Sequence, residues 1–212
     1  MSLEAIRNIR KNGIRALNID EGDELISAVL TDGQRNILLA TRDGYAICFD
    51  ENDARPMGRD AVGVRGIKLR EGDRVIGALP AIPGAQVLSI TENGYGKRTA
   101  TEEYLRGGEE AGPQKRGGMG LKSYNVTDKT GCVSTVRTVK GGEDVLLVAD
   151  DGTIIRTNVS GVSVLGRATQ GVRIMRPNEG AHVISAALTE PEDNEDGEDG
   201  LPGDGGAVTE EE

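Results

Sequence analysis

The chain has 212 residues, a formal net charge of −10, one histidine, two cysteines and no tryptophan. That length suits one domain or a run of repeats, and no stretch approaches the ~20 apolar residues of a membrane span. The single His182 and the widely spaced Cys48 and Cys132 exclude a His-rich metal site and a disulfide framework. We therefore expect a cytoplasmic protein with no secretory signal, no metal and no cofactor of its own.

The negative charge is concentrated at the C-terminus. Residues 190–212 contain eleven acids and no lysine or arginine, which leaves 24 acids against 25 bases in residues 1–189. From residue 189 onward the composition is mostly Glu, Asp, Gly and Pro, which cannot bury enough apolar surface to fold. The sequence thus predicts a nearly neutral folded domain, residues 1–188, followed by a disordered acidic tail, residues 189–212.

The first strong pattern along the chain is an internal repeat. An apolar segment opens each unit, at residues 23–30, 73–79, 132–136 and 181–188, with spacings of 50, 59 and 49 residues. Within the first three units two further apolar runs flank a turn pair: these pairs are Asp43-Gly44, Asn93-Gly94 and Asp151-Gly152. Such pairs indicate β-hairpins, because both central residues of a two-residue turn need a positive φ.

Each unit ends in a glycine- and arginine-rich segment and a short closing strand, at residues 58–69, 114–122 and 166–174. Gly13-Ile14-Arg15 resembles the end of a preceding unit. Four short strands at a period of about fifty residues predict an all-β fold of propeller-like blades. We expect three complete antiparallel four-stranded blades, approximately residues 23–72, 73–131 and 132–180, with partial strands before and after them.

Basic residues recur at matching places in these units. The closing strands carry Arg15, Lys68, Lys122 and Arg173, the segments before them carry Arg59, Arg65 and Arg167, and the hairpin return strands carry Arg98 and Arg156, with Lys97 beside Arg98. Positive charge repeated once per blade predicts a basic track along one rim that binds duplex phosphates. Aromatic residues are too scarce, at 2% of the chain, to favour the base stacking of single-strand binders.

Residues 114–120 are the segment richest in glycine and positive charge. The residues of interest there are Gln114, Lys115, Arg116, Gly117, Gly118 and Gly120. A nucleotide-binding P-loop is excluded, because Gly120 is followed by Leu121 and not by Lys and Ser or Thr. We expect its backbone N–H groups and cations to contact a nucleic-acid backbone. The alternative is a solvated glycine loop.

Three longer motifs give the repeats a family resemblance. Gly-Val-Arg-Gly-Ile at 63–67, Glu-Asn-Gly-Tyr-Gly-Lys-Arg-Thr at 92–99 and Gly-Arg-Ala-Thr-Gln-Gly-Val-Arg-Ile at 166–174 closely resemble the C-terminal domain of the DNA gyrase A protein, a type IIA DNA topoisomerase. The resemblance runs from about residue 14 to residue 188. It implies a six-bladed β-pinwheel, in which neighbouring blades exchange strands, and this chain resembles its last three blades.

The resemblance also covers residues 114–120. They match five of the seven positions of the family's Gln-Arg-Arg-Gly-Gly-Lys-Gly box, and Lys115 and Met119 depart from it. The box of the family lies in the first blade, whereas this segment lies in a late one, so it resembles a second, repeat-related copy.

The same resemblance implies a function. The family's domain wraps duplex DNA around a basic rim and supports ATP-dependent negative supercoiling by its parent enzyme, DNA gyrase. Its partners would be duplex DNA, the rest of the gyrase A protein and the gyrase B protein. The catalytic tyrosine, ATP and Mg²⁺ belong to other domains, so no residue here inherits a catalytic role. The acidic tail would either compete with DNA for the rim or only keep the domain soluble.

Two other interpretations of the repeats stay open. One is the equivalent C-terminal domain of the topoisomerase IV A protein, and the other is a protein-interaction propeller with an apolar or mixed rim. A propeller hydrolase is disfavoured, because it needs converging histidines or carboxylates and the chain has only His182.

Overall fold

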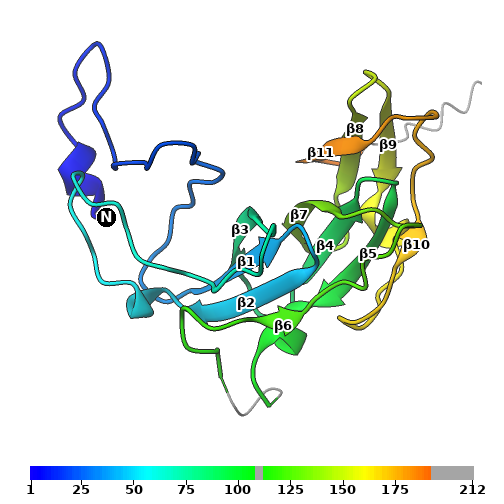
Figure 1. Ribbon diagram of the computed structural model, residues 1–212, viewed down its shortest axis with the longest axis horizontal. Coiled ribbons are helices and arrows are strands. Elements are labelled where there is room, and N and C mark those ends of the chain that lie inside the picture. Colours follow the sequence, from blue (N-terminus) through cyan, green and yellow to red (C-terminus); the bar gives the residue numbers. More distant parts are fainter. Residues whose placement is uncertain (108–111, 192–212) are drawn as a thin grey trace, which may run out of the picture.

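The computed structural model describes residues 1–107 and 112–191, and its regular structure consists of β-strands and short 3-10 turns (Figure 1). The strands are β1 (Asn36–Thr41), β2 (Tyr45–Asp50), β3 (Val75–Ala81), β4 (Gln86–Thr91), β5 (Tyr95–Ala100), β6 (Leu121–Lys122), β7 (Val133–Val139), β8 (Asp144–Ala149), β9 (Ile154–Asn158), β10 (Val172–Arg173) and β11 (Val183–Thr189). The 3-10 turns are η1 (Leu3–Ile6), η2 (Glu51–Asp53), η3 (Thr101–Tyr104) and η5 (Val159–Gly161).

The predicted all-β class is confirmed. In the part of the chain that the structure describes, no helix has the length and apolar character needed to cross a membrane. The predicted acidic tail lies outside the described residues from position 192 onward.

All three predicted hairpins form, as the antiparallel pairs β1–β2, β4–β5 and β8–β9. Their turns differ from the predicted type, because only the glycines Gly44, Gly94 and Gly152 have a positive φ, at 80°, 75° and 84°. Each glycine N–H bonds the carbonyl oxygen three residues earlier. The connections are therefore type I turns closed by a left-handed glycine, and the preceding Asp or Asn keeps an ordinary negative φ.

The strands assemble into three sheets that exchange strands between repeats. Sheet 1 has the order β3-β1-β2-β6, sheet 2 the order β10-β5-β4-β7 and sheet 3 the order β11-β8-β9. In sheets 1 and 2 the hairpin of one repeat is flanked by the first and the last strand of the next repeat. This exchange confirms the pinwheel arrangement: sheets 1 and 2 each combine strands from two of the predicted blade ranges, and sheet 3 combines the range 132–180 with the strand predicted after it.

The exchange gives each sheet an inner and an outer edge. β3 packs against β7, and β7 packs against β11, so these inner strands lie side by side. The short strands β6 and β10 form the opposite edges of sheets 1 and 2. We call β6 and β10 the closing strands, and they lie on the perimeter of the molecule (Figure 1).

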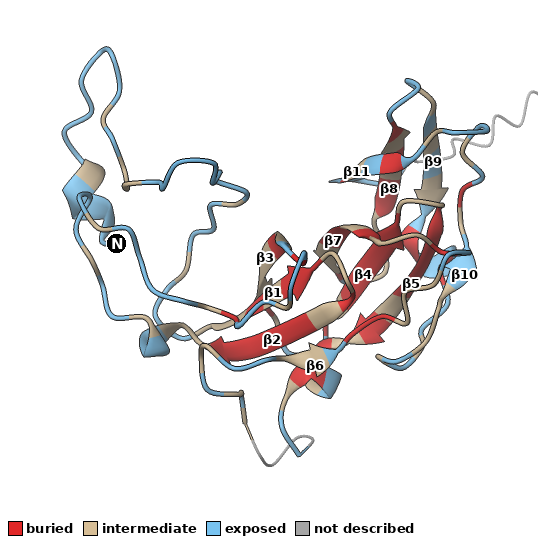
Figure 2. Ribbon diagram, viewed as in Figure 1, coloured by how far each residue is buried: buried red, intermediate tan, exposed pale blue. Residues whose placement is uncertain are grey.

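The hydrophobic core lies between consecutive sheets, where Figure 2 shows the buried positions gathered on the strands. Between sheets 1 and 2 the buried residues include Leu38, Cys48, Val87 and Val136. Between sheets 2 and 3 they include Ile90, Val145, Leu147 and Ala186. Burial raises the pKa of the Cys48 thiol to about 11, so this cysteine acts as a small apolar core residue.

The predicted inner strand at residues 23–30 and the predicted closing strand at residues 58–69 do not form, and strand exchange explains both, because each would pair with the hairpin of a preceding repeat. Residues 23–30 form no strand, and Leu25 and Leu30 are 59% and 75% exposed. An inner strand pairs with the hairpin that precedes it in the chain, and residues 1–23 contain no hairpin. Sheet 3 has three strands among the described residues where four were predicted, because the closing strand of the third unit, β10, pairs with β5 of sheet 2.

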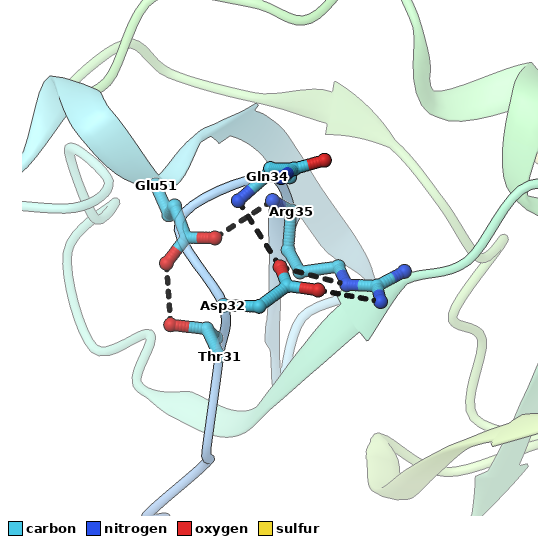
Figure 3. Close-up of polar contacts among 5 residues, drawn as sticks. All are labelled: Thr31, Asp32, Gln34, Arg35 and Glu51. Atoms are coloured by element: carbon cyan, nitrogen blue, oxygen red, sulfur yellow. Dashed lines mark hydrogen bonds and ion pairs between the residues drawn. The ribbon is translucent and has the colours of Figure 1, made fainter.

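The first 35 residues form an N-terminal arm that is mostly exposed and leads away from the sheets (Figures 1 and 2). A polar cluster fixes the arm where β1 begins (Figure 3). Glu51 accepts the Arg35 backbone N–H at 2.7 Å and the Thr31 hydroxyl, and Asp32 forms an ion pair with Arg35 at 2.8 Å. The Arg35 guanidinium, together with the Gln34 backbone N–H, lowers the pKa of Asp32.

Candidate nucleic-acid interface

The closing strands place one basic residue each on the perimeter, in equivalent positions. Lys122 of β6 lies opposite Tyr45 of β2, and Arg173 of β10 lies opposite Tyr95 of β5. Both basic side chains are exposed. Residues paired across antiparallel strands project from the same face of a sheet, so each cation stands beside the tyrosine that follows a hairpin turn.

A first tyrosine–cation cluster consists of Tyr45, Arg70 and Lys122 on sheet 1. The guanidinium carbon of Arg70 lies 3.2 Å from the centre of the Tyr45 ring. Arg70 also donates from Nη1 to the carbonyl oxygen of Met119 at 3.2 Å, while Lys122 donates from Nζ to Oδ1 of Asn125 at 2.9 Å. The ring therefore holds one cation against the sheet, and the closing strand adds a second.

A second cluster repeats this arrangement with Tyr95, Lys129 and Arg173 on sheet 2. The guanidinium carbon of Arg173 lies 4.8 Å and Nζ of Lys129 lies 5.5 Å from the centre of the Tyr95 ring. Arg173 also donates from Nε to the Tyr95 hydroxyl at 3.2 Å, and these bonds lower the pKa of Tyr95. Stacking on an aromatic ring orients a guanidinium without neutralising its charge.

Sheet 3 differs from the other two. Thr153 takes the place of the tyrosine after the turn, and the turn itself begins with the exposed residues Asp150 and Asp151. Among the described residues no cation–aromatic contact occurs on this sheet. Positive charge on the perimeter is therefore carried by the closing strands of sheets 1 and 2, next to their tyrosines.

Glycines allow the closing strands to dock this closely. Gly120 and Gly171 precede β6 and β10 with φ of 72° and 71°. A Cβ on Gly120 would lie 2.6 Å from the carbonyl oxygen of Ala46, and one on Gly171 would lie 2.5 Å from that of Gly96. A side chain at either position would therefore push the closing strand, and its cation, away from the sheet.

Residues 114–120 do not offer their backbone donors to a ligand in the way the sequence predicted. The Gln114 N–H bonds the carbonyl oxygen of Cys48 at 2.7 Å, and the Gly117 N–H bonds that of Gly66 at 2.7 Å. The carbonyl oxygen of Gly118 in turn accepts the Lys68 N–H at 2.8 Å. The segment is therefore a strap that links β2 to residues 66–68. The backbone N–H groups of Gln114 and Gly117, which were predicted to bind phosphate, are already hydrogen-bonded to carbonyl oxygens of the protein.

The two cations of this strap have different surroundings. Arg116 is half-buried and donates from Nε to the carbonyl oxygen of Asp53 at 3.0 Å, and from Nη1 to that of Arg65. Lys115 is exposed. Arg116 therefore holds loops together, and Lys115 is the member of the segment that faces solvent.

Lys97 is the clearest error among the predicted DNA contacts. Its side chain is fully buried, and Nζ donates to the carbonyl oxygens of Gly166 (2.7 Å) and Arg167 and to Oγ1 of Thr169 (3.1 Å). The sequence predicted an outward residue because its neighbour Arg98 is also basic. The structure shows instead that Lys97 pins the loop before β10 onto β5.

Removing this buried ammonium should destabilise the fold. A Lys97→Met substitution keeps most of the volume but leaves the Gly166 and Arg167 carbonyls without their donor, at a cost of about 2–4 kcal/mol. Urea unfolding of the variant measures the loss, and Lys140→Met, at an exposed position, is the matched control. Equal stability of the two variants would contradict the anchoring role.

The same lysine should also make stability depend on pH. Burial lowers its pKa from 10.5 to about 8, so between these values the unfolded chain binds more protons than the folded one. Unfolding free energy should therefore rise from about pH 8 toward pH 10.5 more in the native chain than in Lys97→Met. Urea unfolding of both proteins across this pH range tests the sign.

Arg98 and Arg156 do not belong to the perimeter track either. Arg98 is three residues beyond Tyr95, so it projects from the opposite face of sheet 2 to Tyr95 and Arg173. Its guanidinium bonds the carbonyl oxygens of Val162 (2.7 Å) and Ser160 (3.0 Å). The matching Arg156 forms an ion pair with Asp144 at 2.8 Å. Both arginines brace a strand or loop, so the predicted basic track along one rim does not include them.

The remaining predicted residues lie around the arm and the loops. Arg15, Arg59, Arg65 and Lys68 are exposed, and Arg167 is half-buried. Arg15 and Arg59 line one hollow of about 550 Å³ together with Arg10. Lys68 is in no strand, and Gly63 precedes Gly72 by the same nine residues that separate Gly171 from Gly180. That spacing makes Arg65, and not Lys68, the counterpart of Arg173.

Sequence reasoning missed two cluster members, Arg70 and Lys129. Each lies a few residues before an inner strand, Arg70 before β3 and Lys129 before β7, outside the closing and return strands where the repeated charges were sought. The signal that could have found them is the pair Tyr45 and Tyr95, which stand at equivalent positions after the turns. In the described residues no group of three or more His, Cys, Asp or Glu could hold a metal ion.

These features define a class of protein, a strand-exchanged β-propeller with tyrosine–cation clusters on its perimeter. The family model of the DNA gyrase C-terminal domain, a beta-propeller, matches residues 1–32, 35–81, 85–140 and 143–190. The chain therefore belongs to the DNA gyrase C-terminal domain family, as the sequence motifs indicated.

Similar proteins agree with this assignment. The DNA gyrase A protein of Staphylococcus epidermidis is 43% identical over 195 residues, covering 91% of this chain and 21% of that protein. The same protein of Staphylococcus aureus is 41% identical over 200 residues, covering 93% and 22%. This chain thus spans about a fifth of the length of the curated relatives it matches.

Two solved structures share the fold. One described as the structure of DNA gyrase A C-terminal domain has a TM-score of 0.74 and 27% identity, over 84% of this chain and 58% of that one. The C-terminal domain of DNA topoisomerase IV has a TM-score of 0.79, over 89% of this chain and 57% of that one. Its identity is 22%, so this second likeness supports the fold alone.

Proposed function

We propose that this chain binds duplex DNA along its perimeter and bends it around the sheets, as the C-terminal domain of a gyrase A protein. The observation that carries the proposal is the repetition of one cluster, Tyr45 with Arg70 and Lys122, then Tyr95 with Lys129 and Arg173. Cations spaced once per sheet suit the regularly spaced phosphates of a duplex, and they carry no base-specific information.

The sheet arrangement supports bending as well as binding. The inner strands β3, β7 and β11 pack beside one another, so successive sheets fan out from a common side. Perimeter cations on fanned sheets do not lie on a straight line, and a duplex that contacts both clusters must curve. The bending energy of DNA over such a site is a few kcal/mol, which several phosphate contacts offset.

In this proposal the chain performs no catalysis alone. It presents wrapped DNA to the rest of the gyrase A protein and to the gyrase B protein in a cytoplasmic, ATP-dependent topoisomerase that introduces negative supercoils. ATP and Mg²⁺ act in other parts of that enzyme. The topoisomerase IV counterpart, with the same fold, is the alternative parent.

A topology experiment tests the wrapping. Nicked circular DNA is religated in the presence of increasing amounts of the chain, and the linking number of the products is measured after deproteinisation. Wrapping predicts a shift of consistent sign that grows with protein, and a Lys122→Gln/Arg173→Gln variant should lose it. Binding with no change in linking number would contradict wrapping while leaving DNA binding intact.

A salt titration separates this function from a protein-interaction propeller. Phosphate contacts make log affinity fall linearly with log salt, by about 0.9 for each contact. An affinity for duplex DNA that is weak and independent of salt would favour the protein-interaction alternative.

A further inference from the structure

The two closing strands are joined by direct contacts between the residues beside them. Tyr124 follows β6 by two residues, and its hydroxyl donates to the carbonyl oxygen of Gln170, two residues before β10. The backbone N–H of the next residue, Asn125, donates to the carbonyl oxygen of Thr169 at 3.0 Å. We call these four residues the perimeter bridge. It links the strand of one cluster cation to the strand of the other.

Each end of the perimeter bridge is fixed to a different sheet. The Tyr124 backbone N–H donates to the carbonyl oxygen of Gly44 at 2.9 Å, in the hairpin turn of sheet 1. At the other end Nζ of Lys97, on β5 of sheet 2, donates to Oγ1 of Thr169 at 3.1 Å and to the carbonyl oxygen of Gly166 at 2.7 Å. The perimeter bridge therefore ties sheet 1 to sheet 2 beside their closing strands.

Burial makes the hydroxyl bond of Tyr124 hard to open. The side chain is fully buried, and it belongs to the core between sheets 1 and 2. Removal from water raises the pKa of its hydroxyl, so the group stays protonated and able to donate. A buried hydroxyl that loses its acceptor has no water to replace it, and this is costly. The bond to Gln170 is therefore a firm link between the two strands.

The next repeat provides a comparison for this position. Met175 follows β10 as Tyr124 follows β6, and its backbone N–H likewise bonds the carbonyl oxygen of the turn glycine, here Gly94. Met175 is buried in the core between sheets 2 and 3, and its side chain has no hydroxyl. Packing at this place therefore does not require a hydrogen-bond donor. What tyrosine adds between sheets 1 and 2 is the bond to the neighbouring closing strand.

We infer that Tyr124 is a positioning residue for DNA bending, because its hydroxyl bond fixes the separation and angle of Lys122 and Arg173. The inference rests on the proposed function, in which both cations contact one duplex. A duplex held at two fixed points has to take the curve that those points define, at a cost in bending energy. With the bond removed, the two strands shift and the cations follow straighter DNA. Loss of the hydroxyl therefore reduces bending, while the phosphate contacts remain.

The test compares two variants that each lose one buried hydroxyl. Tyr124→Phe keeps the ring in the core and removes only the donor to Gln170. Thr101→Val removes a hydroxyl that donates to the carbonyl oxygens of Ile82 (2.8 Å) and Ala85 (3.1 Å). Thr101 lies beyond the end of β5 that is remote from its pairing with β10. Urea unfolding of both variants shows how much stability each one loses, so Thr101→Val controls for a merely structural effect.

Three properties are measured for the native chain and for both variants. They are the affinity for duplex DNA, its salt slope, and the linking-number shift per bound chain on religated nicked circles. Tyr124→Phe should keep the native affinity and salt slope, because it removes no phosphate contact. Its linking-number shift should be smaller than that of the native chain. Thr101→Val should match the native chain in all three. Energy transfer between the labelled ends of a linear duplex should show a smaller bend with Tyr124→Phe alone.

Two results would overturn this inference and leave the proposed function standing. One is an equal linking-number shift for the native chain and Tyr124→Phe, and the other is an equal loss of that shift in Tyr124→Phe and Thr101→Val. If the affinity and salt slope of Tyr124→Phe fall as far as those of Lys122→Gln/Arg173→Gln, the hydroxyl supports phosphate binding and not curvature. A native chain that binds DNA without any shift overturns the wrapping itself, and this inference with it.

Discussion

Replacing Lys122 and Arg173 together by glutamine is expected to weaken duplex-DNA binding about a hundredfold at ~0.1 M salt. Each phosphate contact contributes about 0.9 to the slope of log affinity against log salt, which amounts to roughly tenfold in affinity at that salt. The two residues are exposed and stand at equivalent positions on β6 and β10. The slope itself should fall by about two.

A matched variant makes this result specific. Arg74 and Lys140 are exposed cations next to the inner strands β3 and β7. Arg74→Gln/Lys140→Gln removes the same charge from the same chain but from the inner side of the sheets. Its affinity and salt slope should stay close to those of the native chain. If both double variants lose affinity equally, net charge and not the perimeter determines binding.

The sequence predicted the parts of the fold that depend on local chemistry. The three turn pairs predicted the hairpins β1–β2, β4–β5 and β8–β9, because glycine supplies the left-handed residue that each connection needs. The repeated apolar runs predicted the inner strands β3, β7 and β11. These signals lie within a few residues of the elements that they specify.

The segment at residues 23–30 shows what local signals leave out. It has the apolar pattern of an inner strand, yet a strand is stable only with a partner on the ladder, and its partner would be a hairpin earlier in the chain. The exposure of Leu25 and Leu30, at 59% and 75%, is the result of that missing partner. A segment can therefore have the correct apolar pattern of a strand and still not form one when its pairing partner is absent.

The candidate interface was only partly predictable, for a similar reason. Lys122 and Arg173 were found because closing strands repeat in sequence. Lys97 was assigned to DNA wrongly, because sequence cannot show that the loop before β10 folds over it and supplies Gly166 and Thr169 as partners. Arg98 was assigned to the wrong face of sheet 2. Side chains alternate between the two faces along β5, but only the register with β10 shows which face carries Arg173.

Gly171→Ala is expected to detach β10, the closing strand of sheet 2, and to lower the free energy of unfolding substantially. At φ 71° an alanine is strained by about 1–2 kcal/mol. Its Cβ would also lie 2.5 Å from the carbonyl oxygen of Gly96 and 2.6 Å from the hydroxyl of Tyr124. Relieving this overlap costs about 1–3 kcal/mol more, because both neighbours are buried and cannot yield easily.

The comparison with Gly152→Ala separates the two effects. Gly152 has a φ of 84°, but no atom lies within 4 Å of its Cβ position. This control has the backbone strain without the overlap, so urea unfolding should show Gly171→Ala to be less stable by about 1–3 kcal/mol. Because β10 carries Arg173, only Gly171→Ala should also weaken DNA binding and reduce its salt slope. If the two variants have equal stability and equal DNA affinity, the docking of β10 neither stabilises the fold nor positions the DNA interface.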